Sequence, residues 1–250
     1  MVEESSVIAV VGPGAVGGLL AWLLHRAGAN VVVVGRPQSV ERIASQGLRV
    51  TSDMFGGGTE PVPARSTVPE GASVILTVKT PGLTGSLELI AQSRPRDLLS
   101  LMNGVGHQEV LAQRLGNVPV AAGSIAVEAL RTADGTIEHK SPFLRVTVPE
   151  RASTFPSVRA LAATAAELTV GGTDVEVLWA KFRFLAPMAL LTSYWQAPLG
   201  EALAKGCRPH RCAAGRGGGV RGRGRCAGHG RVARRHPGVV PGHDALVAAR

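Results

Sequence analysis

The sequence predicts a doubly wound α/β fold, in which a mostly parallel β-sheet lies between two layers of helices. Short apolar runs without polar alternation recur between residues 7 and 122, as in parallel strands that are buried on both faces. Stretches of helical composition separate these runs, and a glycine cluster follows the first of them. Such an alternation of strands and helices favours a parallel sheet that is covered on both sides.

The first three elements are expected to form a βαβ unit. Residues 7–11 are predicted to be a strand, residues 15–27 a helix that ends at Gly28, and residues 31–34 the next strand. The later elements of the predicted parallel sheet are strands at 74–78, 98–102 and 118–122, with helices at 83–92 and near 109–115.

The pattern changes after residue 122. Three strand-like runs follow, at residues 125–130, 136–139 and 144–148, and Asp134-Gly135 is a hairpin turn signal. These runs are expected to form an antiparallel extension at the edge of the sheet. A helix at 156–168 and a short strand at 173–177 are expected next. From Leu178 the sequence is helical, which indicates a second, all-α domain.

The net charge of +9 is unevenly distributed. Eleven of the 27 Lys and Arg residues lie in residues 205–250 with one of the 18 acidic residues, which leaves 16 basic and 17 acidic residues in 1–204. A Gly/Arg tract can bind nucleic acid through phosphates, but this one has no aromatic residue to stack on bases, so nucleic-acid binding is the weaker interpretation. The three cysteines also lie there without a C-x-x-C pair, and no metal site is predicted.

The uncharged run at 7–24 is long enough to suggest a membrane span or a signal peptide. Glu3 and Glu4 precede it, however, where a signal peptide needs positive charge, and several glycines interrupt it. We therefore expect a cytoplasmic protein that does not enter a membrane.

Residues 12–17 match the pattern G-x-G-x-x-G between a strand and a helix. The first glycine permits a tight turn, the second lets the backbone approach a pyrophosphate, and the third lets the helix pack closely on the strand. Free N–H groups at the helix N-terminus favour a phosphate. A Rossmann-type dinucleotide site is therefore expected at Gly12, Pro13, Gly14, Ala15, Val16 and Gly17; a glycine-rich turn without a ligand is the alternative.

Arg36 follows the second strand of this unit, in Gly35-Arg36-Pro37. An acidic residue at this place accepts hydrogen bonds from the 2′-hydroxyl of NAD, whereas an arginine suits the 2′-phosphate of NADP. The sequence therefore favours NADPH/NADP as the cofactor, with an ordinary solvated arginine as the alternative.

Three further polar residues are candidates for the active site. Lys79 and Asn103 each follow an apolar strand, so both are expected at the carboxyl edge of the sheet, where α/β proteins bind ligands. Lys181 lies within an apolar helical stretch, where a lysine usually extends to water. If it is desolvated beside the cofactor, its ammonium group can donate a proton to a carbonyl oxygen as hydride arrives at carbon.

Together these residues resemble the ketopantoate reductase (2-dehydropantoate 2-reductase) family. The resemblance extends over residues 7–204 and rests on the segments 12–18, Arg36, 78–79, 103–106, 123–129 and 178–182, in the order and spacing of the family. It implies NADPH-dependent reduction of a 2-oxo acid to a 2-hydroxy acid, as in pantothenate biosynthesis. It also implies that Lys181 is the proton donor, that Asn103 and Ala129 contact the cofactor, that Asn103 and Lys181 contact the substrate, and that Lys79 lies near the nicotinamide.

The chain departs from the family pattern beyond Lys181. Where family members carry three asparagines, this chain has Leu185, Ala189 and Leu199. Sites that hydrogen-bond a polar substrate discriminate strongly, so these replacements are expected to change or weaken substrate binding. The identity of the 2-oxo acid is left open, and an NADP-binding protein without turnover is the alternative function.

The expected organisation is an NADP-binding domain at 1–175, the start of a truncated helical substrate or dimerisation domain at 176–204, and a Gly/Arg-rich tail at 205–250. The tail shows no hydrophobic periodicity. We hypothesise that it is read out of frame, because Gly and Arg codons shifted by one base encode mainly Val, Ala, Glu, Asp and Gly. Apolar residues such as Phe182 and Phe184 would then lack partners, which predicts a homodimer or aggregation.

Overall fold

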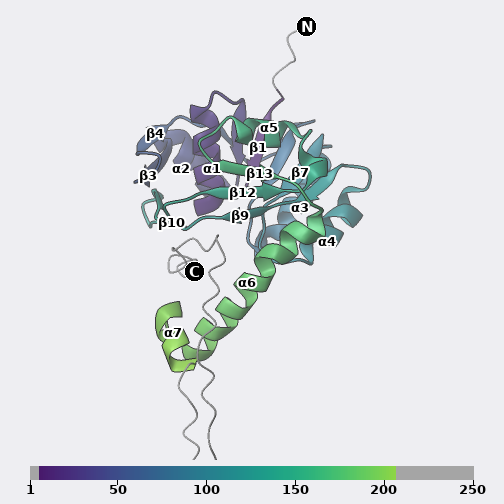
Figure 1. Ribbon diagram of the computed structural model, residues 1–250. Coiled ribbons are helices and arrows are strands. Elements are labelled where there is room, and N and C mark those ends of the chain that lie inside the picture. Colours follow the sequence, from purple (N-terminus) through teal and green to yellow (C-terminus); the bar gives the residue numbers. More distant parts are fainter. Residues whose placement is uncertain (1–5, 207–250) are drawn as a thin grey trace, which may run out of the picture.

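The computed structural model describes residues 6–206, which fold around a six-stranded sheet with the strand order β5-β2-β1-β6-β7-β8 (Figure 1). All neighbouring strands in this sheet are parallel. The strands are β1 (Ile8–Val11), β2 (Val31–Val34), β5 (Ala64–Arg65), β6 (Ser73–Leu76), β7 (Asp97–Ser100) and β8 (Val120–Ala122). The predicted doubly wound parallel sheet is therefore confirmed.

The helices of this part of the chain cover the two faces of the sheet. They are α1 (Ala15–Arg26), α2 (Pro37–Gln46), α3 (Leu83–Gln92), α4 (His107–Leu115) and α5 (Pro156–Ala162), with short 3-10 helices η1 (Thr80–Gly82) and η2 (Glu150–Ala152). Helix α2 was not expected from the sequence, although Pro37 at its first position and the buried Ile43 are typical of an amphipathic helix.

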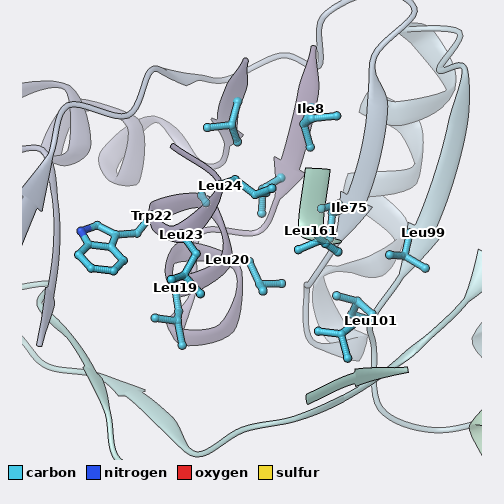
Figure 2. Packing of buried hydrophobic residues seen from close by; sticks show 14 of the residues in the cluster. Ile8, Leu19, Leu20, Trp22, Leu23, Leu24, Ile75, Leu99, Leu101 and Leu161 are labelled. Carbon is cyan, nitrogen blue, oxygen red and sulfur yellow. The ribbon is translucent and has the colours of Figure 1, made fainter. Parts of the chain in front are cut away.

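The side chains of β1 show why its sequence has no polar alternation. Ile8 and Val10 belong to one buried cluster with α1 and α5, whereas Ala9 and Val11 belong to another with α3 and α4. Figure 2 shows the first cluster, in which leucines of α1 lie beside Ile8. A strand with both faces in a core needs apolar residues at every position.

The strand order reverses beside β1. From β1 the chain crosses to β2 and then to β5, and it returns through β6 on the other side of β1. At such a reversal the connections leave in opposite directions, so a crevice opens at the carboxyl ends of the central strands. The fold therefore places the glycine turn after β1 where doubly wound sheets bind ligands.

The strands after residue 122 do not extend the edge of this sheet. Together with the earlier strands β3 and β4, they form two further sheets, with the strand orders β10-β11-β3-β4 and β13-β12-β9. Their members are β3 (Leu48–Ser52), β4 (Gly58–Glu60), β9 (Ser124–Ala126), β10 (Ala129–Arg131), β11 (Ile137–His139), β12 (Arg145–Val148) and β13 (Glu167–Val170). The expected antiparallel pairing is confirmed for β10 and β11, which flank the turn at Asp134-Gly135, but the expected place at the edge of the main sheet is wrong. β11 pairs in parallel with β3, a strand that was not predicted, and β12 pairs in parallel with β13.

The helix expected at 156–168 is confirmed from Pro156 but is shorter than expected, and the strand expected at 173–177 is wrong. Helix α5 ends at Ala162, and the strand is β13, which precedes the predicted position. Thr173 instead caps a long helix: its hydroxyl accepts a hydrogen bond from the Glu176 N–H, and the Glu176 carboxylate accepts one from the Thr173 N–H. This reciprocal pair is a capping box, which begins a helix rather than a strand.

The capped helix is α6 (Asp174–Trp195), which packs on the sheet at its start and then extends away from it, with α7 (Leu199–Gly206) at its far end (Figure 1). Within residues 6–206, no helix is both long enough and apolar enough to cross a membrane. The Gly/Arg-rich tail from residue 207, with its three cysteines and the proposed frame change, lies outside the described residues.

Candidate cofactor and active site

The glycine turn joins β1 to α1, and each of its three motif glycines occupies a distinct environment. Gly12 has a φ of +96°, a conformation that L side chains rarely adopt. A Cβ on Gly17 would collide with the Gly12 carbonyl oxygen and the Thr77 hydroxyl, so close packing of helix on strand excludes any side chain there. The geometry therefore requires glycine at both ends of the motif.

At Gly14, in the middle of the turn, the backbone borders open space and the first N–H groups of α1 have no side-chain acceptor. A Cβ on Gly14 would have no atom within 4 Å, so the backbone is accessible at this point. Gly14 is also the N-cap of α1 and has no side chain to occupy the N–H groups of the first turn. These features fit a pyrophosphate, whose charge the N-terminus of a helix favours. Pro13, by contrast, is buried, while Ala15 and Val16 are partly buried in the first turn.

Arg36 lies at the N-terminus of α2, directly after β2. It is the N-cap residue of that helix, and its side chain is exposed. Gly35 packs against the Pro13 ring, because a Cβ on Gly35 would lie 2.7 Å from the Pro13 Cγ. The structure therefore brings Arg36 next to the glycine turn, on the β2 side.

Lys79 and Asn103 lie at the carboxyl edge of neighbouring strands, as predicted. Lys79 is exposed and caps η1 shortly after β6, and Asn103 is exposed shortly after β7. Because β6 lies between β1 and β7, both residues lie at the same edge of the sheet as the glycine turn.

Lys181 reaches this edge from α6. Its Nζ donates hydrogen bonds to the Asn103 Oδ1 and to the Ile125 carbonyl oxygen, both at 2.7 Å. Burial lowers the pKa of the Lys181 ammonium to about 8, because desolvation disfavours its charged form. The lysine is therefore partly buried, and two oxygen acceptors hold its amine at the sheet edge.

An ion pair fixes the start of α6. Asp174 is buried, and its carboxylate accepts two hydrogen bonds from the Arg151 guanidinium and one from the Ala122 N–H at the end of β8. Asp174 precedes Lys181 by seven residues, about two helical turns, so the anchor and the lysine lie on the same side of α6. This contact orients the helix that carries the lysine.

Some residues around the site carried no signal in the sequence. Thr77 donates from its hydroxyl to the carbonyl oxygens of Val11 and Gly12 and so supports the turn from β6. Arg131, at the end of β10, donates from Nη1 to the Pro13 carbonyl oxygen at 3.0 Å. Ala129 is partly buried on the same strand and packs against the core. A threonine in an apolar run was the one available hint, and nothing in the sequence pointed to Arg131.

The three residues that replace the family asparagines lie on the helical part. Leu185 is partly buried one turn beyond Lys181, Ala189 is exposed one turn further, and Leu199 begins α7. None of the three side chains can donate or accept a hydrogen bond.

The parallel sheet with its strand reversal, the glycine turn and the lysine at the carboxyl edge define a Rossmann-like α/β domain. The family model described as "Ketopantoate reductase PanE/ApbA" matches residues 8–152, more than half of the chain, and the chain belongs to this family. The resemblance found in the sequence is thereby confirmed.

Two curated relatives and one solved structure illustrate the similarity. The uncharacterized oxidoreductase YkpB of Bacillus subtilis is 26% identical over 203 residues, which are 78% of this chain and 67% of the relative. The 2-dehydropantoate 2-reductase of Pyrococcus horikoshii is 34% identical over 121 residues, which are 45% of this chain and 38% of that enzyme. The crystal structure of a PanE/ApbA family ketopantoate reductase from Ralstonia eutropha superposes with a TM-score of 0.69 at 26% identity, over 78% of this chain and 66% of that structure.

Proposed function

We propose that the protein binds NADPH and reduces a 2-oxo acid to the 2-hydroxy acid, with Lys181 as the proton donor. The observation that carries the proposal is the position of the Lys181 Nζ, which is partly buried at the sheet edge and held by Asn103 and Ile125. Membership of a reductase family supports the reaction class. The Arg36 guanidinium supports NADPH over NADH, since it suits a 2′-phosphate.

The chain's own residues have separate tasks in this reaction. Bound NADPH supplies a hydride to the substrate carbonyl carbon. The N–H groups that begin α1 hold the pyrophosphate, and the Lys181 ammonium donates its proton from Nζ to the carbonyl oxygen. With a pKa of about 8, this ammonium is largely protonated at pH 7 and releases its proton more readily than an ordinary lysine.

The substrate is proposed to be less polar than ketopantoate. Leu185, Ala189 and Leu199 offer no hydrogen bond to a substrate hydroxyl, and a buried polar group without a partner costs about 1–3 kcal/mol. A 2-oxo acid with an apolar side chain avoids this cost. Lys79 and Asn103 remain as polar contacts near the reacting group, and Ala129 as a cofactor contact.

Turnover tests this proposal. NADPH oxidation is measured with a panel of 2-oxo acids that differ in side-chain polarity, for the wild type and for Lys181→Ala. We expect apolar 2-oxo acids to be preferred and the substitution to lower kcat by about 10²–10⁴-fold, the typical contribution of a general acid. Glu201→Ala on exposed α7 is the matched control and should leave kcat unchanged. Equal rates for wild type and Lys181→Ala would exclude the lysine as proton donor.

Cofactor binding without turnover is the second candidate. It is favoured by the large apolar side chains that α6 leaves exposed, among them Trp179, Leu190 and Tyr194. The match covers 66% of the Ralstonia eutropha structure, so about a third of that structure has no counterpart in the matched part of this chain. NADPH binding together with an absence of turnover for every 2-oxo acid tested would select this candidate.

A further inference from the structure

Arg131 is brought to the glycine turn from a distant part of the chain. It ends β10, which pairs with β11 in the second sheet, and its Nη1 donates to the carbonyl oxygen of Pro13, 118 residues earlier. Its side chain is exposed, and this bond uses one of its five N–H donors. The guanidinium is therefore held in place beside the turn while it retains further donors.

Pro13 also links Arg131 to Arg36. The Pro13 ring packs against Gly35, the residue that precedes Arg36, while the Pro13 carbonyl accepts from Arg131. Arg131 and the residue before Arg36 thus contact the same buried proline, one at its carbonyl and the other at its ring.

The surroundings of Arg131 are rich in positive charge. Arg42 lies close enough that, after burial, Arg131 and then Arg49 are the main causes of its lowered pKa. Arg42 donates to the Gly135 carbonyl oxygen, and Arg49 pairs with Asp134 at 3.2 Å. Asp134 is the acidic residue that acts on Arg42, and it also interacts with Arg49. Such a gathering of like charge is costly unless an anion binds nearby.

We infer that Arg131 is a second contact for the 2′-phosphate of NADPH, which it shares with Arg36. The inference rests on the proposed function, because it assumes that the cofactor binds at the glycine turn. The pyrophosphate has its own donors at the N-terminus of α1. The Arg131 guanidinium, on the β2 side of the turn, is therefore assigned to the 2′-phosphate. An arginine suits this task because its planar donor fork matches phosphate oxygens.

Direct binding tests this assignment without turnover. Isothermal titration calorimetry is performed with two probes, adenosine 2′,5′-bisphosphate and adenosine 5′-monophosphate, which differ only in the 2′-phosphate. We expect Arg131→Ala to weaken the first probe about tenfold, as for the loss of one charge-assisted hydrogen bond, and the second less than about twofold. Arg131→Lys, which keeps the charge, should recover part of the loss.

Arg49→Ala is the matched control, because it removes a guanidinium of the same cluster that pairs with Asp134. It should affect neither probe by more than about twofold. Thermal melting of each variant shows whether it is folded. If Arg131→Ala does not fold, Arg131→Lys still tests the inference.

The outcomes separate the inference from the proposed function. If Arg36→Ala weakens the bisphosphate and Arg131→Ala does not, the inference is wrong and the cofactor assignment remains. An equal loss for both probes would show that Arg131 acts on the glycine turn or on the 5′-phosphate, and this would also overturn the inference. If the wild type binds neither probe, both the inference and the proposed function fail.

Discussion

Lys181 combines two properties at the scale of a single residue. Its ammonium group is desolvated, which lowers its pKa to about 8, and it is held by two oxygen acceptors at 2.7 Å. Because this pKa remains above 7, the amine is largely protonated at neutral pH. A proton donor needs this balance between holding and releasing its proton.

The pH dependence of turnover follows from this pKa. Because the protonated amine is the active form and its pKa is lowered to about 8, kcat/KM for reduction should be constant below that pH and fall above it. Initial rates of NADPH oxidation between about pH 6 and pH 10 check this. A profile that stays flat to the alkaline end would contradict the role of Lys181.

Asn103→Asp is expected to move that decline to higher pH. A carboxylate at the position of Oδ1 would lie 2.7 Å from the Lys181 Nζ and stabilise the ammonium form. Asn103→Ser supplies a neutral comparison that adds no charge. If the decline keeps its position in Asn103→Asp, Lys181 is not the group that titrates.

At the scale of the element, the anchor of α6 decides where the lysine lies. The carboxylate of Asp174 is nearly buried and joins η2, the end of β8 and the first turn of α6 through Arg151 and Ala122. Removal of this carboxylate leaves the Ala122 N–H without its acceptor, and a buried donor without a partner is costly.

We expect Asp174→Ala to lower the free energy of unfolding by roughly 1–3 kcal/mol and to reduce kcat, because the helix that carries Lys181 is released. Glu167→Ala is the control, since the Arg145–Glu167 pair is a similar contact at 2.8 Å between exposed side chains. Exposed pairs contribute about 0–1 kcal/mol. Urea denaturation measures both, and equal losses would show that the Asp174 contact is no more than a surface ion pair.

At the scale of the whole molecule, α6 leaves an apolar stripe in contact with solvent. Val175, Trp179, Leu190 and Tyr194 lie on one side of the helix and are 60%, 47%, 72% and 78% exposed. Exposed apolar patches of this kind promote association. This supports the homodimer or aggregate that the sequence predicted.

Self-association should therefore rise with concentration. Size-exclusion chromatography with light scattering is expected to show species larger than the monomer, and Leu190→Glu should reduce them, because a charge disfavours burial of the stripe. Ala204→Glu, on the exposed side of α7, introduces the same charge elsewhere and should have little effect. A monomer at all concentrations that melts in one sharp transition would contradict the prediction.

The sequence by itself determined the elements whose signals are local. The apolar run of β1, the glycine turn, and the strand β2 with Arg36 at its end were all predicted, because strand periodicity and turn chemistry are set within a few residues. The same is true of α3, which occupies the residues expected for it. Local patterns also correctly predicted that Lys79 and Asn103 lie at the carboxyl edge of the sheet.

Only the tertiary structure decided which distant residues meet. The pairing of β11 with β3, the contact of Lys181 with Asn103 across 78 residues and that of Arg131 with Pro13 across 118 depend on register and on the packing of α6 and β10. No local pattern records such contacts, because their free energy is gained only when separate elements dock. The glycine turn, Arg36 and the candidate Lys181 were therefore predictable from the sequence, whereas the contacts that hold the Lys181 amine and the position of Arg131 were not.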